Sequence, residues 1–215
     1  MDRKPFAIHS LGKSDLREAA KLCAAAMNDN PIHIKVFGAP PELRLRRLGR
    51  FFPSLIRYVH RKGQLHGAFV EGTLVGVMGM LPPKHCKPSL TDLLKMMPAL
   101  LNSNNPAGTV RLAIWLGTWA RLDPPTPHWH LGPLATAPAW QHQGIGSQLM
   151  ELALKTGSGD AHYLETDKLS NVGFYERFGF SVLAQPSILA TPSWVMMKPA
   201  FTHGETPEIN AAYQA

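Results

Sequence analysis

Gly144 and Gly146 stand two positions apart, where a polar stretch gives way to a helical pattern. Inside a helix each glycine costs roughly 1 kcal/mol relative to alanine, so this placement indicates a backbone that something approaches closely. The first N–H groups of a helix lack internal acceptors and carry the positive end of its dipole. We therefore expect a pyrophosphate on this backbone. The alternative is a glycine pair needed only for turn geometry. The expected helix has an apolar stripe typical of a buried face, formed by Ile145, Leu149, Leu152 and Ala153.

Strand and helix patterns alternate through the second half of the chain, which predicts a sheet of the α/β class. The expected elements there are strand 128–136, helix 144–156, strand 161–166, helix 171–178, and strands 179–185 and 193–199. The first half predicts a strand over 5–10 and a helix over 15–27 that is capped by Ser14. An irregular stretch over 28–42 and a second helix over 41–61, ended by Gly63, come next. A hairpin of strands 64–70 and 73–81 completes this half.

Residues 82–127 form an insertion between the hairpin and the next strand. It predicts two helices, over 89–101 and 109–122, which are placed to form a pocket wall. Pro98 falls inside the first helical pattern and should end or kink it. We expect a single domain over residues 1–200, followed by a C-terminal tail over 201–215.

Composition narrows the function classes. Apolar residues make up 45% and charged residues 17% of the 215 residues, which indicates a globular chain. The net charge of +7 suits an anionic ligand; its densest cluster, residues 44–50, fits a solvated helix face, and no nucleic-acid motif accompanies it. No run of 18 apolar residues and no leader pattern occur, so we expect a cytoplasmic protein without membrane or nucleic-acid partners. The two cysteines, Cys23 and Cys86, are expected to stay reduced.

The spacing around the glycines selects among phosphate-binding motifs. A dinucleotide fold needs a third glycine where Leu149 stands, and a Walker loop needs a lysine that is missing after Gly146. The pattern that fits is Q-x-x-G-x-G, at residues 141–146. It resembles the acyl-CoA pyrophosphate loop of the GNAT superfamily of N-acyltransferases. The segment NVGFYERFGF, at 171–180, is similar to the second cofactor segment of that family. The longer segment LETDKLSNVGFYERFGF, at 164–180, and SWVMMKP, at 193–199, resemble the puromycin N-acetyltransferase branch.

This resemblance is strongest over residues 128–199 and poor over 82–127. It implies a mixed α/β (α+β) fold with a mostly antiparallel central sheet of about six or seven strands, flanked by helices and splayed between the fourth and fifth strands. Gly132-Pro133 agrees with an opened or bulged strand, because proline has no N–H for the ladder. The family resemblance further implies acetyl-CoA as cofactor. The contacts that it implies come from Leu134, Ala135, Thr136, Gln141, His142, Gln143, Gly144, Ile145, Gly146, Ser147 and Asn171.

The resemblance also implies roles in the reaction. Tyr175 is the expected acid for the departing thiolate, since a phenol is protonated at neutral pH. His130 occupies the place of a family base, and its ordinary pKa suits a proton acceptor. Glu165 and Trp129 are expected to contact the acceptor substrate. Structural roles remain the alternative for each: a backbone hydrogen bond for the phenol, hydrogen bonding for the histidine and carboxylate, and core packing for the tryptophan.

Three other residues carry weaker hypotheses. His128 shares a strand face with His130, but two histidines without a third ligand make a poor metal site, so we expect no metal. Asp167 is a further candidate for holding a cationic amine. Cys86 is expected to be an ordinary thiol, since no base is organised around it.

The sequence therefore predicts an acetyl-CoA-dependent N-acetyltransferase that acts on the primary amine of a small molecule, by direct attack in a ternary complex. A CoA-binding regulatory module without turnover is one alternative, and an acyltransferase acting on a peptide or protein amine is another. A nucleic-acid binder using the basic helix is a third. We expect a monomer or a homodimer.

Overall fold

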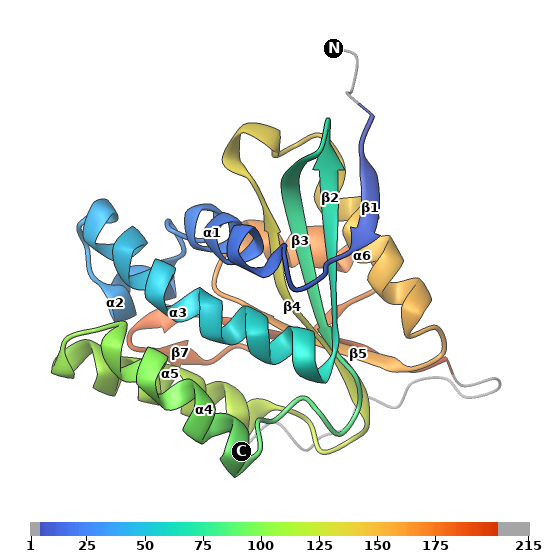
Figure 1. Ribbon diagram of the computed structural model, residues 1–215. Helices are drawn as coiled ribbons and strands as arrows, with labels where there is room; N and C mark the ends of the chain where they lie inside the picture. The colour runs from blue at the N-terminus through green and yellow to red at the C-terminus, as the bar shows by residue number, and fades with distance from the viewer. Residues whose placement is uncertain (1–4, 202–215) are drawn as a thin grey trace.

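The computed structural model describes residues 5–201 and is built around a seven-stranded sheet (Figure 1). The strand order is β1-β2-β3-β4-β5-β9-β6. Neighbours pair antiparallel except β4 and β5, which are parallel. This confirms the mostly antiparallel sheet expected from the sequence. Its strands are β1 (Ala7–Ser10), β2 (Gln64–Val70), β3 (Thr73–Leu81), β4 (His128–Thr136), β5 (Ala161–Thr166), β6 (Ser181–Ala184) and β9 (Trp194–Lys198).

Helices cover both faces of this sheet. On one face α1 and α3 pack directly on the strands, and α2, α4 and α5 extend that layer; α6 and α7 pack on the other face (Figure 1). The helices are α1 (Leu16–Ala26), α2 (Pro31–Phe37), α3 (Pro41–Lys62), α4 (Leu90–Asn102), α5 (Pro106–Leu122), α6 (Ile145–Thr156) and α7 (Leu169–Glu176). Within residues 5–201, no helix combines the length and apolar character needed to span a bilayer.

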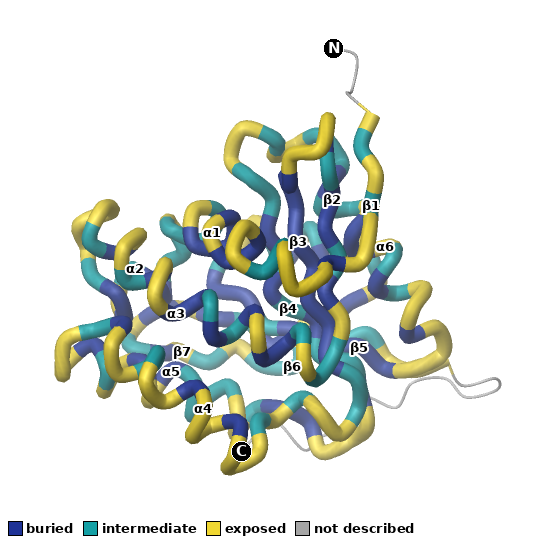
Figure 2. Tube along the Cα trace, in the orientation of Figure 1, coloured by how far each residue is buried: buried dark blue, intermediate teal, exposed yellow. Residues whose placement is uncertain are grey.

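The core has two parts, one on each side of the sheet, and buried backbone concentrates between the layers (Figure 2). On the α6 side, Ile145, Leu149 and Ala153 are buried, as their stripe predicts, and Leu152 is partly buried. On the α3 side the largest contribution comes from a second helical stripe, in which Leu48, Phe52 and Ile56 are buried.

Helix α2 lies where an irregular stretch was expected. It has seven residues, with Pro31 in its first turn, and it buries Ile32, Val36 and Phe37. The Ile32 N–H at its start donates to a carboxylate oxygen of Asp167, 2.7 Å away. The helix is thus stabilised by a distant residue and by burial, and neither is visible in the local pattern.

Other element boundaries also differ from expectation. The residue capping α1 is Asp15 rather than Ser14. Helix α4 continues past Pro98 to Asn102, so the proline does not end it. A two-stranded hairpin of β7 (Ser187–Ile188) and β8 (Thr191–Pro192) was not expected. The predicted tail, 201–215, lies outside the described residues apart from Phe201.

Strands β4 and β5 separate early, which confirms the expected splay. They pair only from His128 opposite Ala161 to His130 opposite Tyr163, although β4 continues to Thr136. From Leu131 onward, the edge of β4 that faces β5 has no strand partner among residues 5–201.

A bulge accompanies the separation, as the Gly132-Pro133 pair predicts. The pairing of β4 with β3 shifts there, so that Gly132 and Pro133 both lie opposite Gly79. A Cβ atom on Gly79 would lie 2.5 Å from the carbonyl oxygen of Gly132. The bulge therefore requires a bare backbone on the neighbouring strand.

We predict that Gly79→Ala lowers the free energy of unfolding by about 1–3 kcal/mol, because the added methyl group overlaps backbone that cannot move freely. Urea denaturation followed by circular dichroism measures this. The matched control is Gly117→Ala in α5, where an added Cβ meets no heavy atom within 4 Å. That change should leave stability equal or raise it by up to about 1 kcal/mol. Equal midpoints for Gly79→Ala and the parent protein would contradict the close approach.

Candidate active site

The N-terminus of α6 presents backbone donors without protein acceptors. We call residues 141–147 the glycine mouth. The first hydrogen bond at this end of the helix runs from the Gln148 N–H to the Gly144 carbonyl, at 3.0 Å. The N–H groups of the four preceding residues, 144–147, find no acceptor in the part of the chain that the structure describes, and no side chain caps the helix. Such a mouth is a ready anion site.

The two glycines have different reasons for being there. Gly144 has a φ of 87°, a left-handed conformation that favours glycine, so turn geometry alone explains it. Gly146 is helical, and a Cβ added to it would make only ordinary contacts, 3.7 Å from Thr136 Oγ1 and 3.9 Å from the Phe174 ring. The protein itself does not require glycine at 146. A bare backbone beside unsatisfied N–H groups fits the diphosphate of a coenzyme A.

The other expected cofactor residues flank the gap between β4 and β5. Leu134, Ala135 and Thr136 form the end of the unpaired edge of β4. On the β5 side, the Asn171 side chain donates to Thr166 Oγ1 at 3.0 Å. Within the mouth, the side chain of Gln141 donates to the Thr136 carbonyl at 3.4 Å and that of Gln143 to the Ala139 carbonyl at 3.3 Å, while His142 is exposed. Asn171 therefore positions the end of β5 through its amide.

A cluster of titratable side chains lies on the opposite face of β4, where the two strands begin to separate. We call Asp123, His128, His130 and Glu165 the histidine cluster. His130 Nε2 and Glu165 Oε2 are 3.0 Å apart. Asp123 Oδ1 lies 3.2 Å from His128 Nε2 and 3.7 Å from His130 Nδ1. Two histidines from one strand are thus held between two carboxylates.

The carboxylates decide the charge of the cluster. Burial disfavours an imidazolium, but Glu165 and Asp123 outweigh it and raise the pKa of His130 to about 10. For His128 burial is likewise outweighed, chiefly by Asp123, and the pKa rises to about 9. Burial opposes ionisation of Asp123, but the two histidines hold the pKa of its carboxyl below its usual range. At neutral pH, therefore, the imidazole of His130 is positively charged in the free protein. It can accept a proton only after it has released one.

Tyr175 lies in α7 and is buried against the rings of Phe174 and Phe180. Burial raises the pKa of its phenol, and the charge of Asp167 raises it further. The hydroxyl therefore stays protonated, as an acid requires. Its helix borders the glycine mouth, because the Phe174 ring approaches Gly146.

Two candidates for substrate contact are not brought to the histidine cluster. Trp129 points to the opposite face of β4 from His130, and its Nε1–H donates to Asp160 at 3.0 Å. The carboxylate of Asp167 accepts hydrogen bonds from Asn30 and from the backbone at the start of α2. The structure unites Glu165 with His130 and leaves Trp129 and Asp167 in other contacts.

Sequence reasoning missed Asp123, the residue that joins the two histidines. It follows α5 and precedes His128 by five residues, across the proline-rich turn DPPTP. Cys86 was expected to be an ordinary thiol, yet its Sγ–H donates to the His128 carbonyl at 3.4 Å. Both belong to the 82–127 insertion. An acidic residue shortly before a strand with two histidines on one face is the signal that was available.

Comparison with known proteins bears on the fold and on one segment of the chain. Residues 99–182 match the family model described as an acetyltransferase (GNAT) domain. An acetyltransferase structure from Corynebacterium glutamicum, titled as histone acetyltransferase HPA2 and related acetyltransferase, is similar with a TM-score of 0.72 and 22% identity; the match covers 93% of this chain and 99% of that one.

Two further structures have the same fold at lower similarity. An agmatine N-acetyltransferase gives a TM-score of 0.55 and 14% identity, over 89% of this chain and 97% of that one. The PaiA N-acetyltransferase of Thermoplasma acidophilum, solved in complex with coenzyme A, gives 0.50 and 15%, over 91% and 99%. The overall fold is therefore that of these solved acetyltransferases, and the GNAT domain match is confined to residues 99–182. Acetyltransferases of the family whose model this segment matches take acetyl-CoA as the acyl donor.

We predict that the free energy of unfolding, measured in the presence of a chelator, falls as the pH rises from about 6.5 to about 10. The folded-state pKa values of His128 and His130 lie above the unfolded value near 6.5. Their contribution is complete below pH 6.5 and is lost as the folded protein releases these protons, a change on the order of 2 kcal/mol. Urea titrations across this range measure it. The slope should flatten in His130→Gln, and an unchanged slope would contradict the assignment.

Proposed function

We propose that the protein transfers the acetyl group of acetyl-CoA to the primary amine of a small molecule, by direct attack of the amine in a ternary complex. The observation that carries this proposal is the placement of two sites along one gap, one offering hydrogen-bond donors and the other a free carboxylate oxygen. Unsatisfied N–H groups lie at the glycine mouth, and the carboxylates of the histidine cluster lie where β4 and β5 part.

The glycine mouth is proposed to hold the diphosphate through the backbone N–H groups of residues 144–147. The unpaired edge of β4, at 134–136, is proposed to bind the pantetheine arm as an added strand, because its backbone groups have no partner on the β5 side. When bound, acetyl-CoA supplies a thioester that is open to attack by an amine. A backbone N–H on the β4 edge then polarises its carbonyl.

Glu165 is proposed to orient the amine. One of its oxygens, Oε2, accepts from His130, while Oε1 is buried and has no hydrogen-bond partner among the described residues. A buried carboxylate oxygen without a donor is costly, and an ammonium group supplies the missing donor. The free oxygen therefore favours a cationic amine as the acceptor.

His130 is proposed to accept the proton that the amine loses. Its imidazole is protonated in the free protein, because two carboxylates raise its pKa. An ammonium group bound to Glu165 places a second positive charge beside it, and a neighbouring like charge lowers a histidine pKa. Amine binding thus favours release of one His130 proton to solvent. The neutral imidazole then takes a proton from the ammonium group, which leaves a neutral amine that can attack the thioester.

Tyr175 is proposed to protonate the departing sulfur. Burial keeps its phenol protonated, and its helix lies beside the glycine mouth.

We predict that Tyr175→Phe lowers kcat on the order of 10²-fold, with little change in affinity for acetyl-CoA, because general acid catalysis typically contributes at least that much. Steady-state kinetics and calorimetric binding measure the two effects. The control is Tyr58→Phe, whose hydroxyl donates to the His85 carbonyl. Full kcat in Tyr175→Phe, where chemistry limits the rate, would refute the role.

We predict that Gly146→Glu weakens the binding of CoA by about 100-fold or more without unfolding the protein. A carboxylate in the first turn of a helix is compatible with its dipole, but here it would take the place of the diphosphate and repel it. The readout is the rise in melting temperature caused by CoA, since a ligand that binds only the folded state stabilises it. In the control Gly117→Glu, in α5, where an added Cβ meets no heavy atom within 4 Å, the rise should be that of the parent protein.

The acceptor remains the open part of this proposal. Structures titled for a histone acetyltransferase and for an agmatine N-acetyltransferase share the fold, so the fold does not select the acceptor. A thiol-release assay over a panel of small amines and peptides tests it. Release with small cationic amines supports the proposal, and release only with peptides favours a protein acceptor. Binding of acetyl-CoA without release on any amine favours a regulatory module.

A further inference from the structure

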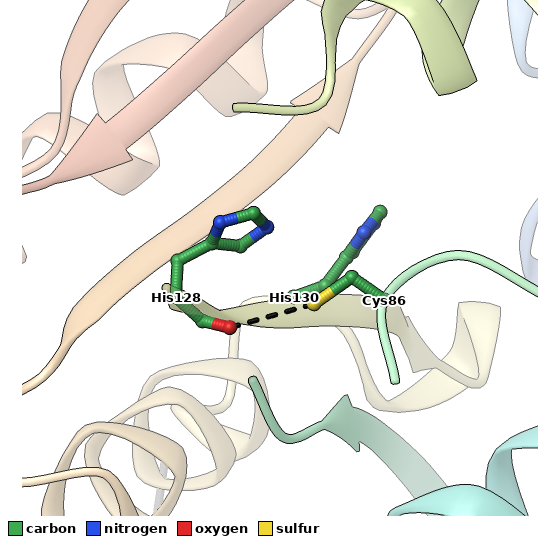
Figure 3. Close-up of side chains that lie close together, drawn as sticks. All are labelled: Cys86, His128 and His130. Carbon is green, nitrogen blue, oxygen red and sulfur yellow. Dashed lines mark hydrogen bonds between the residues drawn. The ribbon is translucent and has the colours of Figure 1, made fainter. Parts of the chain in front are cut away.

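Three potential metal ligands meet beside the gap between β4 and β5. Cys86 follows β3, and His128 and His130 come from β4 (Figure 3). One ligand atom from each lies within 4.8 Å of the others. Two of the three come from a strand and the third from the insertion, so the fold itself brings them together.

Each histidine has one nitrogen hydrogen-bonded away from the cluster and the other near Asp123 Oδ1. His128 Nδ1–H donates to the Thr126 carbonyl at 2.7 Å, and its Nε2 faces Asp123 Oδ1 at 3.2 Å. His130 Nε2–H donates to Glu165 at 3.0 Å, which leaves Nδ1. That Nδ1 is buried and makes no hydrogen bond to any residue in the described part of the chain. Metal-binding histidines are typically oriented in this way, by a carbonyl or a carboxylate on the far nitrogen.

Asp123 offers a carboxylate oxygen beside the two histidines. Its Oδ1 lies 3.2 Å from His128 Nε2 and 3.7 Å from His130 Nδ1. In a tetrahedral zinc site, neighbouring ligand atoms are about 3.3 Å apart. The other oxygen, Oδ2, is 3.3 Å from Lys87 Nζ, so the lysine does not occupy the oxygen that faces the histidines.

We propose that Cys86, Asp123, His128 and His130 bind one divalent transition metal ion with the chemistry of zinc. The set offers one sulfur, two nitrogens and one oxygen, all of them ligand types that zinc accepts. A thiolate and a carboxylate balance its double charge. The sequence predicts no metal because a third ligand is not evident, and the structure supplies that ligand in Cys86.

Metal binding has a consequence for catalysis, and this part rests on the proposed function. An ion held by His130 Nδ1 excludes the proton from that nitrogen and places a fixed positive charge beside Glu165. Both effects oppose the binding and deprotonation of a cationic amine. Zinc should therefore slow acetyl transfer at a fixed concentration of acetyl-CoA.

The test is a titration of the full, chelator-treated chain with Co²⁺, without acetyl-CoA. One equivalent should give the near-ultraviolet thiolate-to-cobalt band and the intense visible bands of tetrahedral cobalt. Cys86→Ser should lose the thiolate band, and Cys86→Ser and Asp123→Asn should each weaken zinc binding by ~100-fold or more. The matched controls are Cys23→Ala, which changes the other cysteine, and His9→Gln; both should bind as the parent does.

Circular dichroism confirms that each variant is folded, and His130→Gln serves as a second test if Cys86→Ser is not. Absence of cobalt binding to the parent, weak octahedral spectra, or unchanged affinity in the folded variants overturns the site. Binding that disappears in Cys86→Ser supports it even if no amine is ever acetylated, so failure of the proposed function remains distinguishable. Zinc bound at this cluster with acetyl transfer undiminished overturns the consequence for catalysis.

Discussion

The pairing of β4 with β5 stops after His130, and most of the functional geometry follows from that limit. The two strands share only the register from His128 opposite Ala161 to His130 opposite Tyr163. A parallel pair that continued to Thr136 would close the sheet and satisfy the backbone of both strands. Because the pairing ends early, one stretch of β4 keeps unpaired backbone groups inside an otherwise continuous sheet. Such groups require a partner, and an extended ligand supplies one.

The gap also joins the two faces of the sheet. The glycine mouth belongs to α6, which packs on one face, while His128 and His130 point to the face covered by α1 and α3. In a closed sheet these sites would be separated by a full layer of strands. The opening permits a ligand held by its phosphates on one side to reach side chains on the other. The bulge at Gly132-Pro133 accompanies the opening, and Gly79 leaves the room that the bulge needs.

Local signals predicted those parts of the molecule that depend on backbone chemistry. Gly144, the stripe headed by Ile145 and the bulged proline each act through a neighbouring residue or a helical repeat, so the sequence displays them. The features it did not display depend on contacts between distant segments. Helix α2 is stabilised by Asp167, more than 130 residues away along the chain. Asp123 and Cys86 contact His128 only because the insertion folds back against β4. No propensity or spacing encodes that approach.

The polar groups at the two ends of the gap differ in kind. The chain as a whole carries a net charge of +7, yet the histidine cluster contains two carboxylates, one of which has a buried oxygen without a donor. The glycine mouth offers the opposite polarity through the end of a helix dipole. In the proposed function, the anionic diphosphate binds at the helix end and the cationic amine at the free oxygen of Glu165, with the reacting atoms between them. The same carboxylates attract any cation, so a proton, an ammonium group and a metal ion compete for the cluster. The cation that binds to the cluster therefore determines whether the imidazole of His130 is free to accept a proton.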